Sequence, residues 1–325
     1  MMWATWARGA SPGGPSGSLS VLFFHRVLAE ADPVLPSEPT AARFERVLDW
    51  LGSQFKLLPL DQAVQRLQAG TLPPAAAAIT FDDGYRDNFE IAAPILHRRG
   101  VPATFFVASG FLDGGVMWND AVIECIRSTR HDTLDLSQLG LPALALHDWA
   151  GRQHAADTVL KAIKYLPFDE RARLVAGIAR ACAVEPPRGL MMSTEQVRGL
   201  AAMGFGVGAH TETHPILARL PDAEASVEIR RGRDRLEAIA NQRVGLFAYP
   251  NGRWRDDFDE RHVGMVENAG FDAAFTTEPG VGRFASNRFA LPRFTPWDRK
   301  PWRFKLRMMA NMRRTQTLGT TIGGP

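Results

Sequence analysis

Cysteine is almost absent from this chain, which has only Cys125 and Cys182 among its 325 residues. Two cysteines are too few for a disulfide framework, so we expect buried thiols and a fold that depends on an ordinary hydrophobic core. Long apolar runs are missing as well, since no stretch approaches the roughly 18 residues of a membrane-spanning helix. Residues 1–18 are rich in Gly, Pro and Ser and lack the apolar core of a signal peptide. We therefore expect a cytoplasmic protein.

An excess of charge of one sign is also lacking, because 38 basic and 35 acidic residues give a formal net charge of +3. The charge is uneven only near the C-terminus, where residues 299–314 hold seven basic residues and no acidic one, which leaves about −4 for the rest of the chain. A body with this charge gives little support to a nucleic-acid partner. We expect a basic tail over 299–325 that either contacts an anionic membrane surface or covers the base of the fold, and we favour the second.

Short apolar runs alternate with amphipathic stretches along most of the chain, which is typical of parallel strands joined by crossover helices. The side chains suited to chemistry follow the ends of the predicted strands, which is the active-site face of a β/α barrel. The alternation is broken at about 113–190, where helical pieces predict an insertion packed over or beside the barrel mouth. We expect strands at 19–24, 75–81, 101–108, 205–209, 246–249 and 271–276, and helices at 41–55, 60–67, 88–99, 193–203, 222–241 and 260–269.

Two motifs at strand ends carry the chemistry. Asp82 and Asp83 follow an apolar run, and Gly84 supplies the permissive backbone for a turn that aims the adjacent carboxylates. His210 and His214 follow another apolar run, at a spacing that brings both imidazoles together if the segment turns helically. One carboxylate and two imidazoles with an open position are typical of a hydrolytic metal centre, and they suit several divalent ions. The other carboxylate can take a proton from water, although the spacing does not say which aspartate has which role.

The sequence Thr-Phe-Asp-Asp-Gly at 80–84, together with His-Thr-x-x-His at 210–214, resembles the polysaccharide deacetylase family, the NodB-homology domain of carbohydrate esterase family four. The resemblance implies an α/β fold, namely a distorted (β/α)7 barrel over 19–298 with a mostly helical insertion, after a flexible segment at 1–18. It also implies a metal-dependent hydrolase that removes N- or O-acetyl groups from an acetylated saccharide. The implied roles are general base for Asp82 and ligands of a divalent metal, usually Zn²⁺, for Asp83, His210 and His214.

A third stretch, 247–252, resembles the family's oxyanion motif in a Tyr-Pro-x-Gly variant. By that resemblance the backbone N–H of Tyr249 helps to hold the oxyanion, and one such donor contributes roughly 3 kcal/mol of transition-state stabilisation in other hydrolases. Pro250 and the rings of Trp118, Trp254 and Trp297 are candidate substrate contacts, because the apolar faces of sugars favour aromatic surfaces.

The chain departs from the family at two places. Gly245 stands where the family has an arginine that orients the base, and Arg293 stands where it has a histidine that acts as general acid. Because an arginine does not donate its proton at neutral pH, we consider two replacements: Arg293 for the missing arginine beside Asp82, and His25 for the missing acid. His25 and the two residues after it also resemble a segment of the branch that acts on exported poly-N-acetylglucosamine.

The favoured function is therefore deacetylation of a sugar, with N-acetyl groups as the expected target, in carbohydrate metabolism or exopolysaccharide synthesis. A metal-dependent deacylase of a non-carbohydrate amide is the alternative among enzymes. A catalytically impaired sugar-binding homologue is the alternative among binding proteins, because two family motifs are altered. The presence of both Asp82 and Asp83 argues against the last of these, since binding alone does not need a base.

Overall fold

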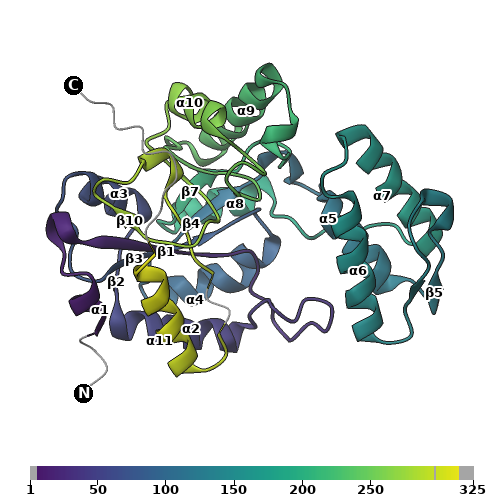
Figure 1. Cartoon of the computed structure of the whole chain (residues 1–325), viewed down its shortest axis with the longest axis horizontal. Helices are drawn as coiled ribbons and strands as arrows, with labels where there is room; N and C mark the ends of the chain where they lie inside the picture. Colours follow the sequence, from purple (N-terminus) through teal and green to yellow (C-terminus); the bar gives the residue numbers. More distant parts are fainter. Residues whose placement is uncertain (1–5, 296–297, 315–325) are drawn as a thin grey trace.

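The structure is a computed structural model that describes residues 6–295 and 298–314. Its centre is a curled parallel sheet whose main strands follow one another in chain order (Figure 1). Phe24 lies opposite Phe81 in the register, and Phe81 lies opposite Phe105. Every expected strand is present, and the strands are β1 (Ser18–Phe24), β3 (Ala76–Phe81), β4 (Thr104–Val107), β7 (Gly206–Ala209), β8 (Leu246–Ala248) and β9 (Ala273–Phe275).

A short segment near the C-terminus closes this sheet into a barrel. Leu291 forms a parallel bridge with Phe275 of β9, and Phe294 forms a parallel bridge with Leu22 of β1. Hydrogen bonds support both bridges, since the N–H of Thr276 donates to the Leu291 carbonyl at 2.9 Å and the N–H of Phe294 donates to the Val21 carbonyl at 2.8 Å. With this segment as the seventh strand, the fold is the distorted (β/α)7 barrel that the sequence predicts. Two short strands, β2 (Lys56–Leu57) and β10 (Gly282–Arg283), pair with β3 and β1.

The helices follow the strands as expected. In α2, the apolar spacing buries Phe44, Val47, Leu48 and Leu51, and the Thr40 hydroxyl caps the first turn. The predicted capping box of α8 is present and gives that helix a fixed start. The helices of the barrel are α2 (Ala41–Gln54), α3 (Leu60–Gln68), α4 (Ala93–Arg98, after a π-helical turn at Asn88–Ala92), α8 (Thr194–Ala202), α9 (Asp222–Ala240) and α10 (Glu260–Asn268).

The insertion forms a helical unit beside the barrel, with an apolar cluster of its own (Figure 1). Its ends are fixed near the strand ends, because the N–H of Asp113 donates to the Met192 carbonyl and the N–H of Met192 donates to the Gly84 carbonyl. Cys125 and Cys182 are buried free thiols, as expected. The elements of the insertion are α5 (Trp118–Ser128), β5 (Thr133–Leu134), β6 (Leu144–Ala145), α6 (Trp149–Ile163) and α7 (Phe168–Cys182).

Both ends of the described chain are packed against the barrel. The stretch expected to be flexible contains α1 (Trp6–Ala10), which contacts α2 and α11 (Pro301–Met312) and buries Ala7 completely. The basic tail contains α11, which buries Phe304 and Met308 and lies beside α1 and α2 (Figure 1). The contacts of α11 include α1, Trp50 of α2 and Arg283 of β10, and the role expected of the basic tail stays a prediction. Within 6–295 and 298–314, no helix has the length and apolar character needed to cross a membrane.

Candidate metal centre and active site

The paired carboxylates lie at the carboxyl end of β3, in a turn with a left-handed backbone. Asp83 has φ 73° and Gly84 has φ 88°, so the chain leaves the strand sharply after Asp82. A glycine is required at position 84, because a Cβ there would lie 2.8 Å from the Val107 side chain. The turn lets the two neighbouring aspartates serve one site from different directions, as the sequence predicts.

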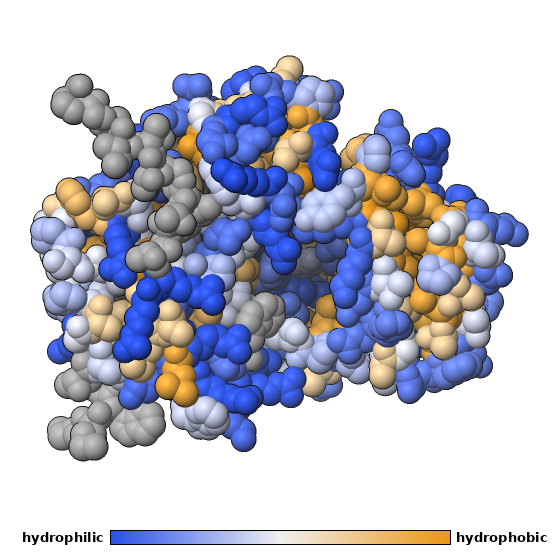
Figure 2. All heavy atoms as spheres, viewed as in Figure 1, coloured by the Kyte–Doolittle hydropathy of each residue, from blue (hydrophilic) through white to orange (hydrophobic). Residues whose placement is uncertain are grey.

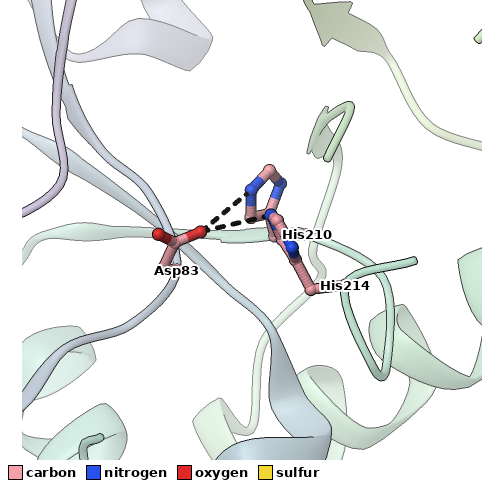
Figure 3. A group of neighbouring side chains, drawn as sticks. All are labelled: Asp83, His210 and His214. Carbon is pink, nitrogen blue, oxygen red and sulfur yellow. Dashed lines mark ion pairs between the residues drawn. The ribbon is translucent and has the colours of Figure 1, made fainter. Parts of the chain in front are cut away.

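Three side chains converge on one point in front of this turn (Figure 3). Oδ1 of Asp83 lies 3.4 Å from Nε2 of His210 and 3.4 Å from Nε2 of His214. In a tetrahedral centre with bonds of about 2.1 Å, neighbouring ligand atoms are separated by about 3.4 Å. The donor atoms therefore fit a divalent cation, with further positions left for water or substrate.

Hydrogen bonds to the main chain fix the imidazoles for this role. Nδ1 of His210 lies 2.7 Å from the carbonyl oxygen of Ala248, so this nitrogen holds the proton and Nε2 keeps its lone pair. His214 is placed by a tight turn instead of the expected helical one, because Thr211 and His214 both have left-handed backbones and the Thr211 hydroxyl accepts the N–H of His214. The Glu228 carboxylate on α9 accepts two N–H groups of the same turn, at 3.0 and 2.8 Å.

The pKa directions agree with metal ligation. Burial alone would raise the pKa of Asp83, but the neighbouring side chains of His210, His214 and His25 outweigh it and hold this pKa well below its usual range. Burial lowers the pKa of His214 to about 4. At neutral pH the cluster therefore presents an ionised carboxylate and a neutral imidazole, which are the forms that bind a metal.

Asp82 is held from the other side by Arg293. The guanidinium donates to both carboxylate oxygens, at 2.6 and 2.7 Å, and its Nε donates to the Thr276 carbonyl at 3.0 Å. Arg293 is fully buried, between the rings of Phe23 and Phe106. The geometry is that of the expected replacement: an arginine from the closing strand fixes the orientation of the Asp82 carboxylate.

The two arginines near the altered motifs have different places. Arg243 lies on the surface and pairs with Asp272, and Gly245 lies against that same carboxylate. Neither residue reaches Asp82, so the orienting contact comes from Arg293 alone among these three positions.

Changing Arg293 to Met is expected to lower the free energy of unfolding by about 3–5 kcal/mol, because it leaves the buried Asp82 carboxylate without a partner. Urea unfolding at neutral pH measures this loss. Arg243→Met is the matched control, since it breaks an exposed pair and should change stability by about 1 kcal/mol or less. The double variant Asp82→Asn, Arg293→Met should recover part of the loss. Equal effects of Arg293→Met and Arg243→Met would contradict the assigned pairing.

His25 lies at the end of β1, on the wall of the same cleft. Burial acts to lower its pKa, but the carboxylates of Asp83, Glu38 and Asp82 act in the opposite direction, and the net effect is a raised pKa. The structure thus places a protonatable imidazole in the same cleft as Asp83, His210 and His214, and its role as substitute acid stays a prediction.

The prediction that the backbone N–H of Tyr249 helps to hold the oxyanion is wrong. Its N–H already donates to the Phe275 carbonyl at 3.0 Å in the sheet, and its hydroxyl donates to the Phe289 carbonyl at 2.9 Å. The ring is fully buried and stacks on Phe258. Asn251, two residues later, has φ 59° and lines the cleft. The Tyr-Pro-x-Gly motif therefore presents its third residue to the site, and the tyrosine anchors the motif in the core.

Two of the predicted substrate contacts lie away from the cleft. Among the described residues that line it, neither Pro250 nor Trp254 is present, and Trp254 packs edge-on against Phe258. Trp297 lies outside the described residues. A tryptophan at the edge of the core and a tryptophan in the cleft are both partly exposed. The sequence therefore does not tell which of the two positions a given tryptophan occupies.

The cleft itself has a volume of about 870 Å³ and runs from the barrel mouth to the insertion. In Figure 2 the hollow between these two parts is surrounded mainly by hydrophilic residues. The barrel contributes Asp82, Asp83, His210 and His214, α11 contributes Arg307, and the residues after α11 contribute Arg314. The insertion contributes Trp118, Asn119, Asp120, Ile123, Leu160, Lys161 and Lys164. A cleft of this size and polarity admits a saccharide of more than one ring.

Comparisons with known proteins identify the family. A family model described as polysaccharide deacetylase matches residues 69–136 and 150–273, which is more than half of the chain. The chain therefore belongs to the polysaccharide deacetylase family, of the NodB-homology type. A Bacillus subtilis (strain 168) protein named "Putative polysaccharide deacetylase YxkH" is 20% identical over 278 residues, which cover 85% of this chain and 70% of that protein.

Solved structures share the fold. The Streptococcus pyogenes deacetylase PplD, in complex with acetate, aligns with a TM-score of 0.60 at 16% identity and covers 90% of this chain and 98% of its own. IcaB from Ammonifex degensii aligns with a TM-score of 0.59 at 20% identity and covers 90% of this chain and 97% of its own. The coverage shows that most of the chain shares the fold of these proteins.

Proposed function

We propose that this protein is a metal-dependent deacetylase that hydrolyses acetamido groups of a saccharide, with Zn²⁺ as the metal. The observation that carries the proposal is the pairing of a base with a metal centre: Asp82, clamped by Arg293, lies next to the ligand set of Asp83, His210 and His214. A sugar-binding protein would need neither the clamp nor the spare carboxylate.

A divalent metal bound by these ligands would polarise the acetyl carbonyl and lower the pKa of a water molecule. In this mechanism Asp82 accepts the proton as the water oxygen attacks the carbonyl carbon. Arg293 keeps both oxygens of the Asp82 carboxylate in place, so that the base does not rotate away from the attacking water. The backbone N–H of Asn251, on the wall of the cleft, is our candidate for the oxyanion donor in place of Tyr249.

Collapse of the tetrahedral intermediate then breaks the C–N bond, and acetate and an amine are formed. An amine leaves only after its nitrogen has gained a proton, so this step needs an acid. His25 is suited to supply it, because it lines the same cleft as the ligands and the surrounding carboxylates favour its protonated form.

Changing His25 to Ala should lower the turnover of an acetamido sugar by about 10² to 10⁴-fold. An acetyl ester with an aryl leaving group departs without protonation, so its hydrolysis should be nearly unaffected. Bound metal, measured by elemental analysis, should be unchanged. His97→Ala on an exposed helix end is the control. Unchanged turnover of the acetamido sugar would remove His25 from the mechanism.

The function as a whole is tested by acetate release from a panel of acetylated oligosaccharides, with and without a chelator. The proposal predicts release that stops with the chelator and returns when Zn²⁺ is added. Binding of the sugars without release would indicate the impaired homologue. Release from simple amides alone would indicate a deacylase of another substrate class.

A further inference from the structure

Asp120, in the first turn of α5, belongs to the insertion but lines the catalytic cleft. Its side chain is buried, with 5% of the residue exposed. Oδ1 accepts a hydrogen bond from the Tyr85 hydroxyl at 3.1 Å. Oδ2 is buried and has no hydrogen-bond partner within the described part of the chain. A buried carboxylate oxygen without a partner is rare in folded proteins and calls for an explanation.

Among the residues that the structure describes, no cation forms an ion pair with this carboxyl group. The charge of Arg26 acts on Asp120, but its guanidinium is bound to Asp87 at 2.8 Å and lies over the Tyr85 ring. Burial, with Asp83 close by, raises the pKa of Asp120 to about 7, although Arg26 and the Tyr85 hydrogen bond act to lower it. The protein itself therefore compensates the charge of Asp120 poorly, as expected of a carboxyl group whose hydrogen-bond partner belongs to a bound ligand.

The two residues before Asp120 line the same wall of the cleft. Trp118 presents an indole, and the guanidinium of Arg171 lies 4.9 Å from the ring and helps to fix it. Asn119 presents an amide that both donates and accepts. Three consecutive residues thus offer an aromatic surface, an amide and a carboxyl oxygen, a combination that suits the apolar face and the polar edge of a pyranose ring.

We propose that Trp118, Asn119 and Asp120 form a saccharide subsite that the insertion contributes to the active site. In this subsite the Oδ2 atom of Asp120 accepts a hydrogen bond from a hydroxyl or N–H group of a sugar ring. The proposal rests on the proposed function, because it takes the substrate to be a saccharide. Its consequence is that the helical insertion, beside the barrel, takes part in choosing the substrate.

The test is the variant Asp120→Asn, which keeps an acceptor for Tyr85 but places a donor where Oδ2 now lies. We expect KM for an acetylated oligosaccharide to rise about tenfold or more, with kcat changed by less than about threefold, since the lost hydrogen bond involves binding and not the reacting atoms. Trp118→Ala should have the same signature. Glu124→Gln is the matched control: it lies one turn further along α5, pairs with Arg127 and does not line the cleft.

A binding measurement separates this inference from the proposed function. Calorimetric titration of the metal-free protein with β-1,4- and β-1,6-linked N-acetylglucosamine oligomers needs no catalysis. The wild-type protein and Glu124→Gln should bind one of them, and Asp120→Asn should bind it about tenfold more weakly. Equal affinity and equal KM in the wild type and Asp120→Asn would overturn the subsite while leaving deacetylation intact. A wild type that binds an oligomer but releases no acetate would overturn the proposed function instead. A wild type that binds neither oligomer would overturn the subsite.

Discussion

Replacing Asp82 by Asn should lower the rate of acetate release by about 10³-fold while the protein still binds its metal. The expectation follows from the position of this carboxylate, which lies beside the candidate metal ligands and is held by two hydrogen bonds from one guanidinium. Asparagine has the same shape, but its amide does not accept a proton at neutral pH. General bases in enzymes typically contribute a factor of 10² to 10⁴.

The measurement compares kcat, bound metal and thermal unfolding for Asp82→Asn and Arg293→Met. Both variants break the same buried pair, so both should lose stability. Only Asp82→Asn removes the base, so it should lose at least ten times more activity than Arg293→Met. If the two variants lost equal activity, the pair would matter for folding alone, and another group would have to be the base.

Replacing His210 by Ala should weaken metal binding by more than about 100-fold and lower activity at stoichiometric metal by about 10³-fold. His210 supplies one of the three ligand atoms, and its orientation depends on the Ala248 carbonyl. Loss of a residue that only supports a ligand typically costs 10 to 100-fold in affinity, and loss of a ligand costs more.

Glu228→Gln offers a graded comparison, because Glu228 holds the turn that carries His214 without touching the ligand atoms. Its effect on metal affinity should fall between those of His210→Ala and an exposed control, His147→Ala. Activity should return to the wild type when zinc is added in excess to Glu228→Gln. Full activity of His210→Ala in the presence of a chelator would rule out the metal centre.

The elements that the sequence predicts well are those set by local patterns. The strand before Asp82 and the helix with Phe44 and Val47 lie where the apolar residues predict them. The strand is a short apolar run that is buried throughout, and the helix buries the face on which its apolar residues recur. The metal ligands follow from the same logic, because parallel strands end at a common edge of the sheet. Arg293 is predicted to lie beside Asp82 because Gly245 stands where the family has its arginine. The hydrogen bond between the two side chains, which are 211 residues apart, confirms this position.

What the sequence does not predict depends on non-local packing. The role of Tyr249 could not be judged without knowing that Phe275 accepts its N–H. Glu228 is one of several charged residues on a long helix, and nothing in that pattern distinguishes it from its neighbours. The closing segment is short and contains a proline, so it lacked the apolar run that identified the other strands.

That closing segment also gives the chain an order of events during its synthesis. Asp82 leaves the ribosome first, whereas the arginine that orients it is made 211 residues later. Until the final strand inserts between its two neighbours, the barrel is open and the base has no fixed direction. The step that seals the wall therefore also fixes the Asp82 carboxylate, and a chain that stops short of this strand has the candidate metal ligands without an oriented carboxylate beside them.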